Sequence, residues 1–221
     1  MKLFFEALIK FACGLLLVGL LIFLPAGTLG YPCGWLFIGL LFVPMLIAGF
    51  VMLARSPEFL KKRLDAKEKQ GTQKGIVALS GLMFIAGFVL AGLDYRFGWS
   101  VMPTWVTVVA SVLFLVSYAL YAEVMRENAY LSRTVKVEEG QTVVDTGLYG
   151  IVRHPMYAVT ILLFMVMPIV LGSWYALIPF AFYPAIIILR LKDEEKLLTR
   201  ELPGYEAYKQ KVKYRIIPFI W

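Results

Sequence analysis

The stretch MYAVTILLFMVMPIVLGSWYALIPFAFYPAIIIL occupies residues 156–189 and contains no charged side chain. A bilayer-spanning helix needs about 20 apolar residues, so this stretch is too long for one span. Gly172 and Ser173 divide it near the middle, and Gly and Ser favour turns. The stretch therefore predicts a tight helical hairpin in a membrane, with short arms at 156–171 and 174–189.

Four further apolar runs precede the hairpin, at residues 4–24, 35–54, 76–93 and 105–122. The chain is 60% hydrophobic and 17% charged, whereas about a quarter of the residues of a soluble domain are charged. The first run follows Lys2 as a signal peptide would, but it is too long for one. We predict an all-α integral membrane protein, a bundle of five to six transmembrane helices depending on whether both hairpin arms cross.

Basic residues gather in two segments that predict the topology. One cluster lies in 55–74 and a second in 192–215, whereas 25–34 is uncharged and 94–104 holds only Asp94 and Arg96. Cytoplasmic loops collect Lys and Arg, so we expect an N-in/C-in protein of the cytoplasmic (inner) membrane. Juxtamembrane cations beside anionic lipid explain the net charge of +7 better than nucleic-acid binding does. The first cluster comprises Arg55, Lys61, Lys62, Arg63, Lys67, Lys69 and Lys74.

The polar residues divide the chain into a scaffold and a region that carries chemistry. Residues 1–122 form the predicted four-helix scaffold, with a short cytoplasmic helix at 57–69. Residues 123–221 begin with a long polar loop, in which RTVKVEEGQTVVDTG (133–147) alternates as a hairpin-like excursion does. After the last span we expect a charged helix, a break at Pro203-Gly204 and a second amphipathic helix. Both regions form a single integrated domain.

Arg153, His154 and Pro155 stand at the start of the hairpin. Pro favours the first turn of a helix, so Pro155 is expected to open the fifth span with His154 at its N-cap. The amides of a first helical turn attract anionic or polar ligands. The alternative is that Arg153 and His154 only bind lipid headgroups.

Asp193, Glu194 and Glu195 lie at the end of the sixth span, where acidic side chains oppose the helix dipole. Lys192, Lys196 and Arg200 can screen them. A sharper hypothesis is that one glutamate meets Arg153 or a cationic cofactor across the bundle.

The tail carries Tyr205, Tyr208 and Val212 at positions i, i+3 and i+7, on one helix face. They form either an interfacial aromatic belt or the wall of a cofactor pocket. No GxGxxG, P-loop, HExxH or nucleophile elbow is present. Cys13 and Cys33 lack ligand partners at metal-binding spacing, so no metal is expected. The spans lack charges at mid-bilayer depth, which disfavours transport.

Two segments, DTGLYGIVRHPMY (145–157) and DEEKLLTRELPGYEAYKQKVKYRIIPFIW (193–221), resemble the isoprenylcysteine carboxyl methyltransferase family, in its bacterial branch. The resemblance covers roughly 128–221 and implies S-adenosylmethionine at the cytoplasmic face. It implies that Arg153 and Glu194 lie nearest the transferred methyl group, with Glu195 as the adjacent alternative. It further implies a cofactor pocket lined by Leu148, Tyr149, Val152, His154, Pro155, Tyr157, Tyr205 and Tyr208.

The methyl acceptor stays open at this stage. Leu202-Pro203-Gly204 stands where prenylcysteine enzymes commonly have Phe-Gly before the tail tyrosines, which puts a prenylated substrate in question. A carboxylate acceptor needs no base and Arg153 would orient it, whereas an amine such as a lipid headgroup would need Glu194 as a base. The expected partners are a lipophilic or prenylated small molecule and membrane lipid. The spans carry no GxxxG-type face, so the sequence specifies no oligomeric state.

Two alternative functions remain. The RHPxY and tail pattern also resembles that of membrane sterol reductases, which use NADPH, so an NADPH-dependent lipid reductase is the first alternative. A non-enzymatic membrane scaffold is the second.

Overall fold

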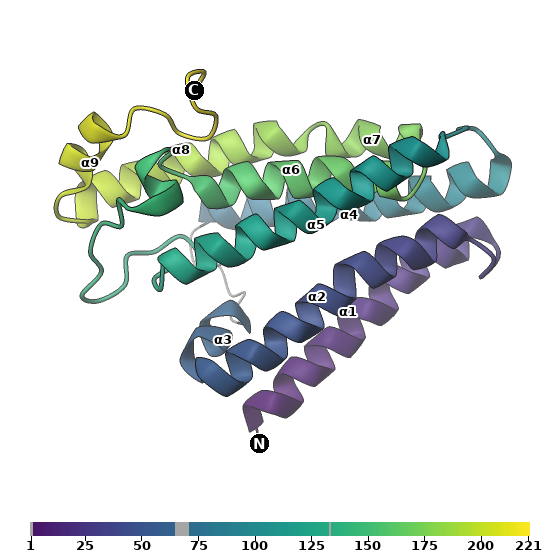
Figure 1. The fold of residues 1–221 in the computed structure, drawn as a ribbon, viewed down its shortest axis with the longest axis horizontal. Coiled ribbons are helices and arrows are strands. Elements are labelled where there is room, and N and C mark those ends of the chain that lie inside the picture. Colours follow the sequence, from purple (N-terminus) through teal and green to yellow (C-terminus); the bar gives the residue numbers. More distant parts are fainter. Residues whose placement is uncertain (1, 65–70, 133) are drawn as a thin grey trace.

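A computed structural model describes residues 2–64, 71–132 and 134–221 (Figure 1). The described residues are mainly helical, and the long helices run roughly along the longest axis of the molecule. The elements are α1 (Lys2–Ala26), α2 (Pro32–Arg55), α3 (Pro57–Leu64), α4 (Gly71–Phe97), α5 (Thr104–Glu127), η1 (Gly147–Gly150, a 3-10 helix), α6 (Pro155–Val170), α7 (Trp174–Phe180), α8 (Tyr183–Glu201) and α9 (Tyr205–Lys211).

Within the described residues, five segments are long and apolar enough to cross a membrane: α1, α2, Gln73–Phe97, α5 and the α7–α8 segment Trp174–Glu201. The fifth predicted run forms α6, which has 16 residues and is therefore shorter than a typical span. The predicted all-α membrane bundle is confirmed. The hairpin is confirmed as well, because α6 ends at Val170 and α7 begins at Trp174 after Gly172 and Ser173.

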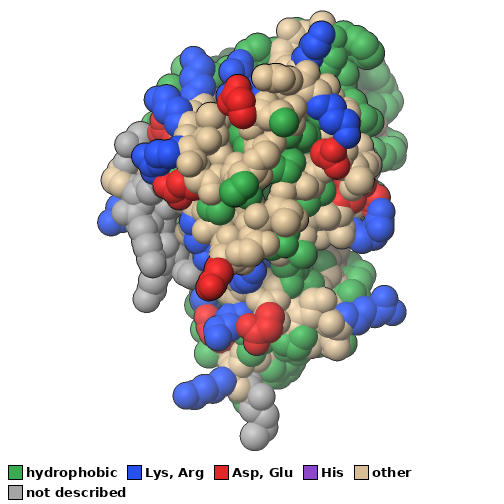
Figure 2. Space-filling model, turned by 90° about the vertical axis from the view of Figure 1, so that its left-hand side faces the viewer, with side chains coloured by type: hydrophobic (Ala, Val, Ile, Leu, Met, Phe, Trp, Pro, Cys, Tyr) green, Lys and Arg blue, Asp and Glu red, His purple; other side chains and the backbone are tan. Residues whose placement is uncertain are grey.

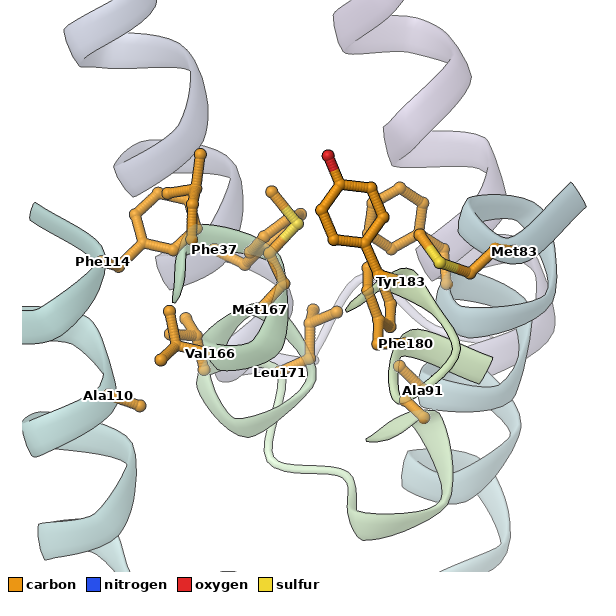
Figure 3. Close-up of a cluster of buried hydrophobic side chains, with 14 of the residues drawn as sticks. Phe37, Met83, Ala91, Ala110, Phe114, Val166, Met167, Leu171, Phe180 and Tyr183 are labelled. Carbon is orange, nitrogen blue, oxygen red and sulfur yellow. The ribbon is translucent and has the colours of Figure 1, made fainter. Parts of the chain in front are cut away.

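The core lies where α4, α5, α6 and the α7–α8 segment meet. Figure 3 shows Phe114 and Ala110 of α5 beside Val166 of α6, and Phe180 and Tyr183 together on the opposite side of the cluster. The α1–α2 hairpin joins this core through α4, and in Figure 1 it diverges from α5 toward the end that carries α3. Large apolar side chains on α1 and α2 stay exposed, as expected of surfaces that face lipid.

A close approach of α1 and α4 depends on Gly92. A Cβ atom at this position would lie 2.4 Å from the backbone oxygen of Ile22, closer than non-bonded atoms can approach. The absence of a side chain therefore lets the two helices pack backbone to backbone.

Two boundaries differ from the prediction. The last span continues into the charged segment as one helix, α8, which ends at Glu201, because no Gly or Pro lies between Pro184 and Pro203. The same span is interrupted between α7 and α8, where Pro184 has no N–H to continue the helical hydrogen bonding. α3 covers 57–64 of the helix predicted at 57–69; the remainder, with Lys67 and Lys69, lies outside the described residues.

α3, the segment before η1 and α9 lie at one end of the molecule, which we call the α3 end (Figure 1). Figure 2 views this end directly: charged side chains of both signs are spread over it, around backbone and uncharged side chains. At the opposite end, buried Asp94 accepts hydrogen bonds from the Ser100 amide (2.6 Å) and from the hydroxyls of Ser100 and Ser173. These hydrogen bonds join the last turn of α4 to the start of α7, far from the α3 end.

Candidate active site

The RHP segment forms the start of α6 as its sequence predicts. Pro155 is the first helical residue and His154 is the N-cap. The backbone also pairs with the tail, because the amide of Arg153 donates to the Tyr214 carbonyl (2.9 Å) and that of His154 to the Arg215 carbonyl (2.8 Å). Residues 61 positions apart in the sequence thus meet at one helix terminus.

A buried ionic cluster holds this junction together. Glu195 accepts a hydrogen bond from Arg153 Nε at 2.8 Å and from Arg215 Nε at 2.9 Å, and His154 Nε2 lies 3.3 Å away. Arg153 Nη1 donates to the carbonyls of Val212 (2.8 Å) and Lys213 (2.9 Å). Arg153 and Glu195 are each only 8% exposed. The expected meeting of a glutamate with Arg153 is confirmed, and it fastens the tail to α6.

The three acidic residues of the 193–195 cluster point to different neighbours. Glu194 accepts a hydrogen bond from the Tyr157 hydroxyl, which in turn accepts one from Arg190 Nε at 3.0 Å. Asp193 lies instead near α4, where it accepts a hydrogen bond of 3.4 Å from the amide of Gln73. Successive residues of an α-helix point about 100° apart, so adjacent carboxylates serve separate sites.

A cavity of about 90 Å³ lies beside Glu194 at the α3 end. One wall is the α8 face that carries Arg190, Glu194, Leu198 and Leu202, at near-helical spacing. The cavity brings together seven of the predicted site residues: Tyr149, Arg153, His154, Tyr157, Glu194, Tyr205 and Tyr208. It does not include Leu148, a residue of η1 that packs against the buried cluster around Tyr149, or the buried residues Val152, Pro155 and Glu195.

The tyrosines are fixed by hydrogen bonds and burial. Tyr208 donates to the Tyr149 carbonyl at 2.7 Å, Asn128 donates to the Tyr149 hydroxyl at 3.0 Å, and the Tyr205 hydroxyl lies 3.4 Å from His154 Nε2. Burial raises the pKa of Tyr149, Tyr205 and Tyr208 above the ordinary value of 10.0. All three are therefore neutral phenols at physiological pH and offer ring faces and hydroxyl groups.

Residues 128–132 and 134–146, which we call the covering loop, contribute the second wall. Gly147 ends it at a φ of 50°, and a Cβ there would lie 1.3 Å from Oε1 of Glu127. Glu127 Oε2 accepts the Leu148 amide at 2.9 Å, so Gly147 gives the carboxylate room to cap η1. The predicted hairpin-like excursion is wrong for the described part of this loop, which has a turn at Glu138–Gln141 but no strand.

No hairpin forms because the apolar side chains of the loop pack against the tail instead of against each other. Val137 and Val143 contact the tail cluster formed by Leu198, Leu202, Tyr205, Tyr208 and Val212. The alternating apolar residues that suggested paired strands instead cover the tail helices.

Sequence reasoning did not select several residues that line the cavity. Arg190 is the most important, and its signal was its place four residues before Glu194, on the same helix face. The others are Asn128, Tyr130, Leu131, Ser132, Thr134, Val135, Lys136, Gln141, Thr142, Val143, Val144, Met156, Leu198 and Leu202. Among residues 2–64, 71–132 and 134–221, no three His, Cys, Asp or Glu side chains gather as a metal site.

Comparison with known proteins tests the family resemblance. Residues 104–200 match the model of the isoprenylcysteine carboxyl methyltransferase (ICMT) family. The chain carries an ICMT-family region. This region covers α5, η1 and α6 to α8, so it includes Tyr157, Arg190 and Glu194. A relative, the uncharacterized protein YpbQ of Bacillus subtilis (strain 168), is 25% identical over 165 residues, which are 74% of this chain and 95% of YpbQ.

Proposed function

We propose that this protein is an S-adenosylmethionine-dependent methyltransferase that acts on a lipophilic acceptor at the membrane surface. The ICMT match supports membrane methyltransferase activity in general. The observation that carries the proposal for this chain is Glu194, a carboxylate held by Tyr157 beside Arg190, facing a tyrosine-lined cavity at the start of α6.

The chemistry of the cavity suits a zwitterionic sulfonium compound. The ring faces of Tyr149, Tyr205 and Tyr208 attract a cation, and the carboxylate of Glu194 provides opposite charge. The N-terminus of α6 and the guanidinium of Arg190 suit a carboxylate group. We therefore assign cofactor binding to the cavity-lining residues, and a supporting role to Leu148, Val152 and Pro155 behind them.

The size of the cavity adds a condition. Sites for ligands of this size usually enclose roughly 300–1,000 Å³, whereas this cavity encloses about 90 Å³. Cofactor binding must therefore displace part of its wall. The covering loop and α9 are the movable parts, because neither belongs to the main core. They contact each other through Val137, Val143 and the exposed pair Lys211–Asp145 (2.6 Å).

S-adenosylmethionine supplies an electrophilic methyl group when bound. The protein's contribution to an in-line displacement is chiefly to position the two reactants. The Tyr157 hydroxyl binds both Glu194 and Arg190 and so holds the two side chains next to each other. If the acceptor is an amine, Glu194 can take its proton. If the acceptor is an acid, Arg190 can orient it. Arg153 and Glu195 keep the tail, and with it Tyr205 and Tyr208, against the cavity.

The proposal includes the orientation of the protein. Both basic segments, α3 and the tail, lie at the α3 end with the cavity. An N-in/C-in protein of the inner membrane would place this end in the cytoplasm, where a water-soluble cofactor is available. The acceptor would enter from the lipid between the helices. Residues 1–122 would serve as the membrane scaffold of the protein, and residues 123–221 would bind the cofactor.

Calorimetric titration of the detergent-purified protein tests the proposal. S-adenosylhomocysteine should bind saturably, and Tyr205→Ala together with Tyr208→Ala should weaken it at least tenfold because the variant loses the aromatic wall. Glu201→Gln, at an exposed ion pair with Arg200, is the matched control and should bind normally. Saturable binding of NADPH in place of S-adenosylhomocysteine would overturn the proposal and favour a reductase.

A further inference from the structure

The α3 end contains a second group of unusual side chains, next to the cavity but outside it. Phe59 of α3, Leu120, Tyr121 and Met125 of α5, and Met156 of α6 are half-buried apolar side chains, which we call the α3 cluster. They pack against a buried core formed by Val124, Leu131, Tyr149 and Val159. Met156 belongs to both places, because it also lines the cavity. The α3 cluster therefore connects the cavity to the side of the bundle where the α1–α2 hairpin diverges from α5 (Figure 1).

A cation lies over this cluster. The guanidinium carbon of Arg63 is 5.5 Å from the centroid of the Tyr121 ring, and Arg63 Nη2 donates to the Tyr121 hydroxyl. Arg63 Nη1 is buried and has no hydrogen-bond partner among the described residues. A buried donor without a partner is costly, so this nitrogen is suited to an acceptor from another molecule.

Other arginines near this end of the described chain show the contrast. Arg126, Arg153, Arg200 and Arg215 each form an ion pair with a glutamate. Arg55 forms none among the described residues, but it is exposed to water, whereas Arg63 has a buried nitrogen. Arg63 forms no ion pair within residues 2–64, 71–132 and 134–221; its described polar partner is the Tyr121 hydroxyl. Arg63 thus has one side of its guanidinium fork bonded and no carboxylate partner among the described residues, and such a fork matches a phosphate or carboxylate.

We infer that Arg63 and the α3 cluster form a binding subsite for an anionic lipid, the oxyanion on Arg63 and the hydrocarbon chain along Phe59, Leu120 and Met125. Unbranched, polarisable methionines such as Met125 and Met156 accommodate chains of varied shape. The inference rests on the proposed function for its role: the bound lipid is the acceptor, and its methyl-accepting group reaches past Met156 into the cavity. The oxyanion is an anchor and is distinct from the group that is methylated.

Proximity to the reaction site supports this role. Tyr121, whose ring lies under Arg63, packs against the same buried core that contains Tyr149. Tyr149 lines the cavity. Tyr121 thus lies between the proposed anchor and the tyrosine wall.

Native mass spectrometry of the detergent-purified protein tests the subsite without turnover. The probes are phosphatidic acid and diacylglycerol with identical chains, and oleate and oleyl alcohol as the carboxylate pair. We expect the wild-type protein to retain phosphatidic acid, oleate or both at least tenfold better than the neutral counterpart. Whichever acid is preferred identifies the oxyanion as phosphate or carboxylate. Arg63→Gln should abolish the preference.

Arg55→Gln is the matched control, because it removes an exposed cation from the same basic segment. It should keep the preference. Equal loss in both variants would mean diffuse attraction to the basic surface and would overturn the subsite, as would absence of a preference in the wild type. Should Arg63→Gln not fold, Arg63→Lys decides: it keeps the charge but loses the fork, so an unchanged preference would also overturn the subsite.

S-adenosylhomocysteine titration of the same samples separates this inference from the proposed function. Normal cofactor binding with no acid preference rejects only the lipid subsite. Acid preference with no cofactor binding rejects the methyltransferase and leaves a lipid-binding site.

Discussion

Replacing Glu195 with Gln should release the tail from α6. The carboxylate accepts hydrogen bonds from Arg153 and Arg215 and lies 3.3 Å from His154 Nε2. Removing one partner of a buried ion pair costs about 3–5 kcal/mol. Arg215 is partly exposed and regains water, so we take the lower bound, about 3 kcal/mol, which is roughly a 100-fold change in the equilibrium between attached and detached tail.

Hydrogen exchange measures this change at defined amides. The amides of Arg153 and His154 donate to the tail carbonyls of Tyr214 and Arg215, so they should exchange about 100-fold faster in Glu195→Gln. Glu194→Gln is the control, because Glu194 bonds Tyr157 rather than the tail and should leave those amides protected. Unchanged protection in Glu195→Gln, or equal loss in both variants, would refute the role of Glu195 as the tail clamp.

Three further perturbations give distinct outcomes. Gly147→Ala should destabilise the protein by at least about 2 kcal/mol, because the new Cβ would overlap the Glu127 carboxylate. Gly140→Ala is the control: its φ is also positive (71°) but the site is open, so the substitution should cost about 1 kcal/mol. Equal shifts in the thermal midpoint of the two variants would contradict the packing argument. The ion pair with Lys136 (2.8 Å) chiefly lowers the pKa of Glu138 below its ordinary 4.5, and Glu138 also pairs with Lys62 of α3 (3.5 Å). The attachment of the covering loop to α3 through Glu138 should therefore be complete above pH 4.5 and lost as pH falls through the lowered value. Hydrogen exchange corrected for pH should show this loss, and an identical pH profile in Glu138→Gln would refute it. Tyr205→Phe should weaken S-adenosylhomocysteine binding only a few-fold if the ring face supplies the affinity; calorimetry showing a loss as large as that of Tyr205→Ala would assign the role to the hydroxyl.

The spans could be predicted from the sequence because the bilayer requires continuous apolar runs. The start of α6 was equally predictable, since Pro155 fixes the first turn and places His154 at the N-cap. The end of the last span could not be predicted from hydropathy alone. Charged residues leave the membrane but do not interrupt the helix, so α8 continues to Glu201.

Within the candidate site, the sequence named the right short segments but could not orient adjacent side chains. Glu194 and Glu195 are chemically identical neighbours, and only the rotation of α8 places one at the cavity and the other on the tail clamp. Arg190 resembled an ordinary cation at a span end until Glu194 was placed on the same face. The hairpin predicted in the covering loop was wrong for a related reason. Alternating apolar and polar residues show that a segment has an apolar side, but they do not show what that side contacts.

The most direct measurement is transfer of a radioactive methyl group from labelled S-adenosylmethionine to a bacterial lipid extract by the protein in liposomes. The account predicts label in the organic phase with the wild-type protein and with Glu201→Gln, and loss of at least 90% of it with Glu194→Gln. Label transfer that Glu194→Gln leaves intact would contradict the assigned site. The absence of transfer together with the absence of S-adenosylhomocysteine binding would contradict the methyltransferase itself.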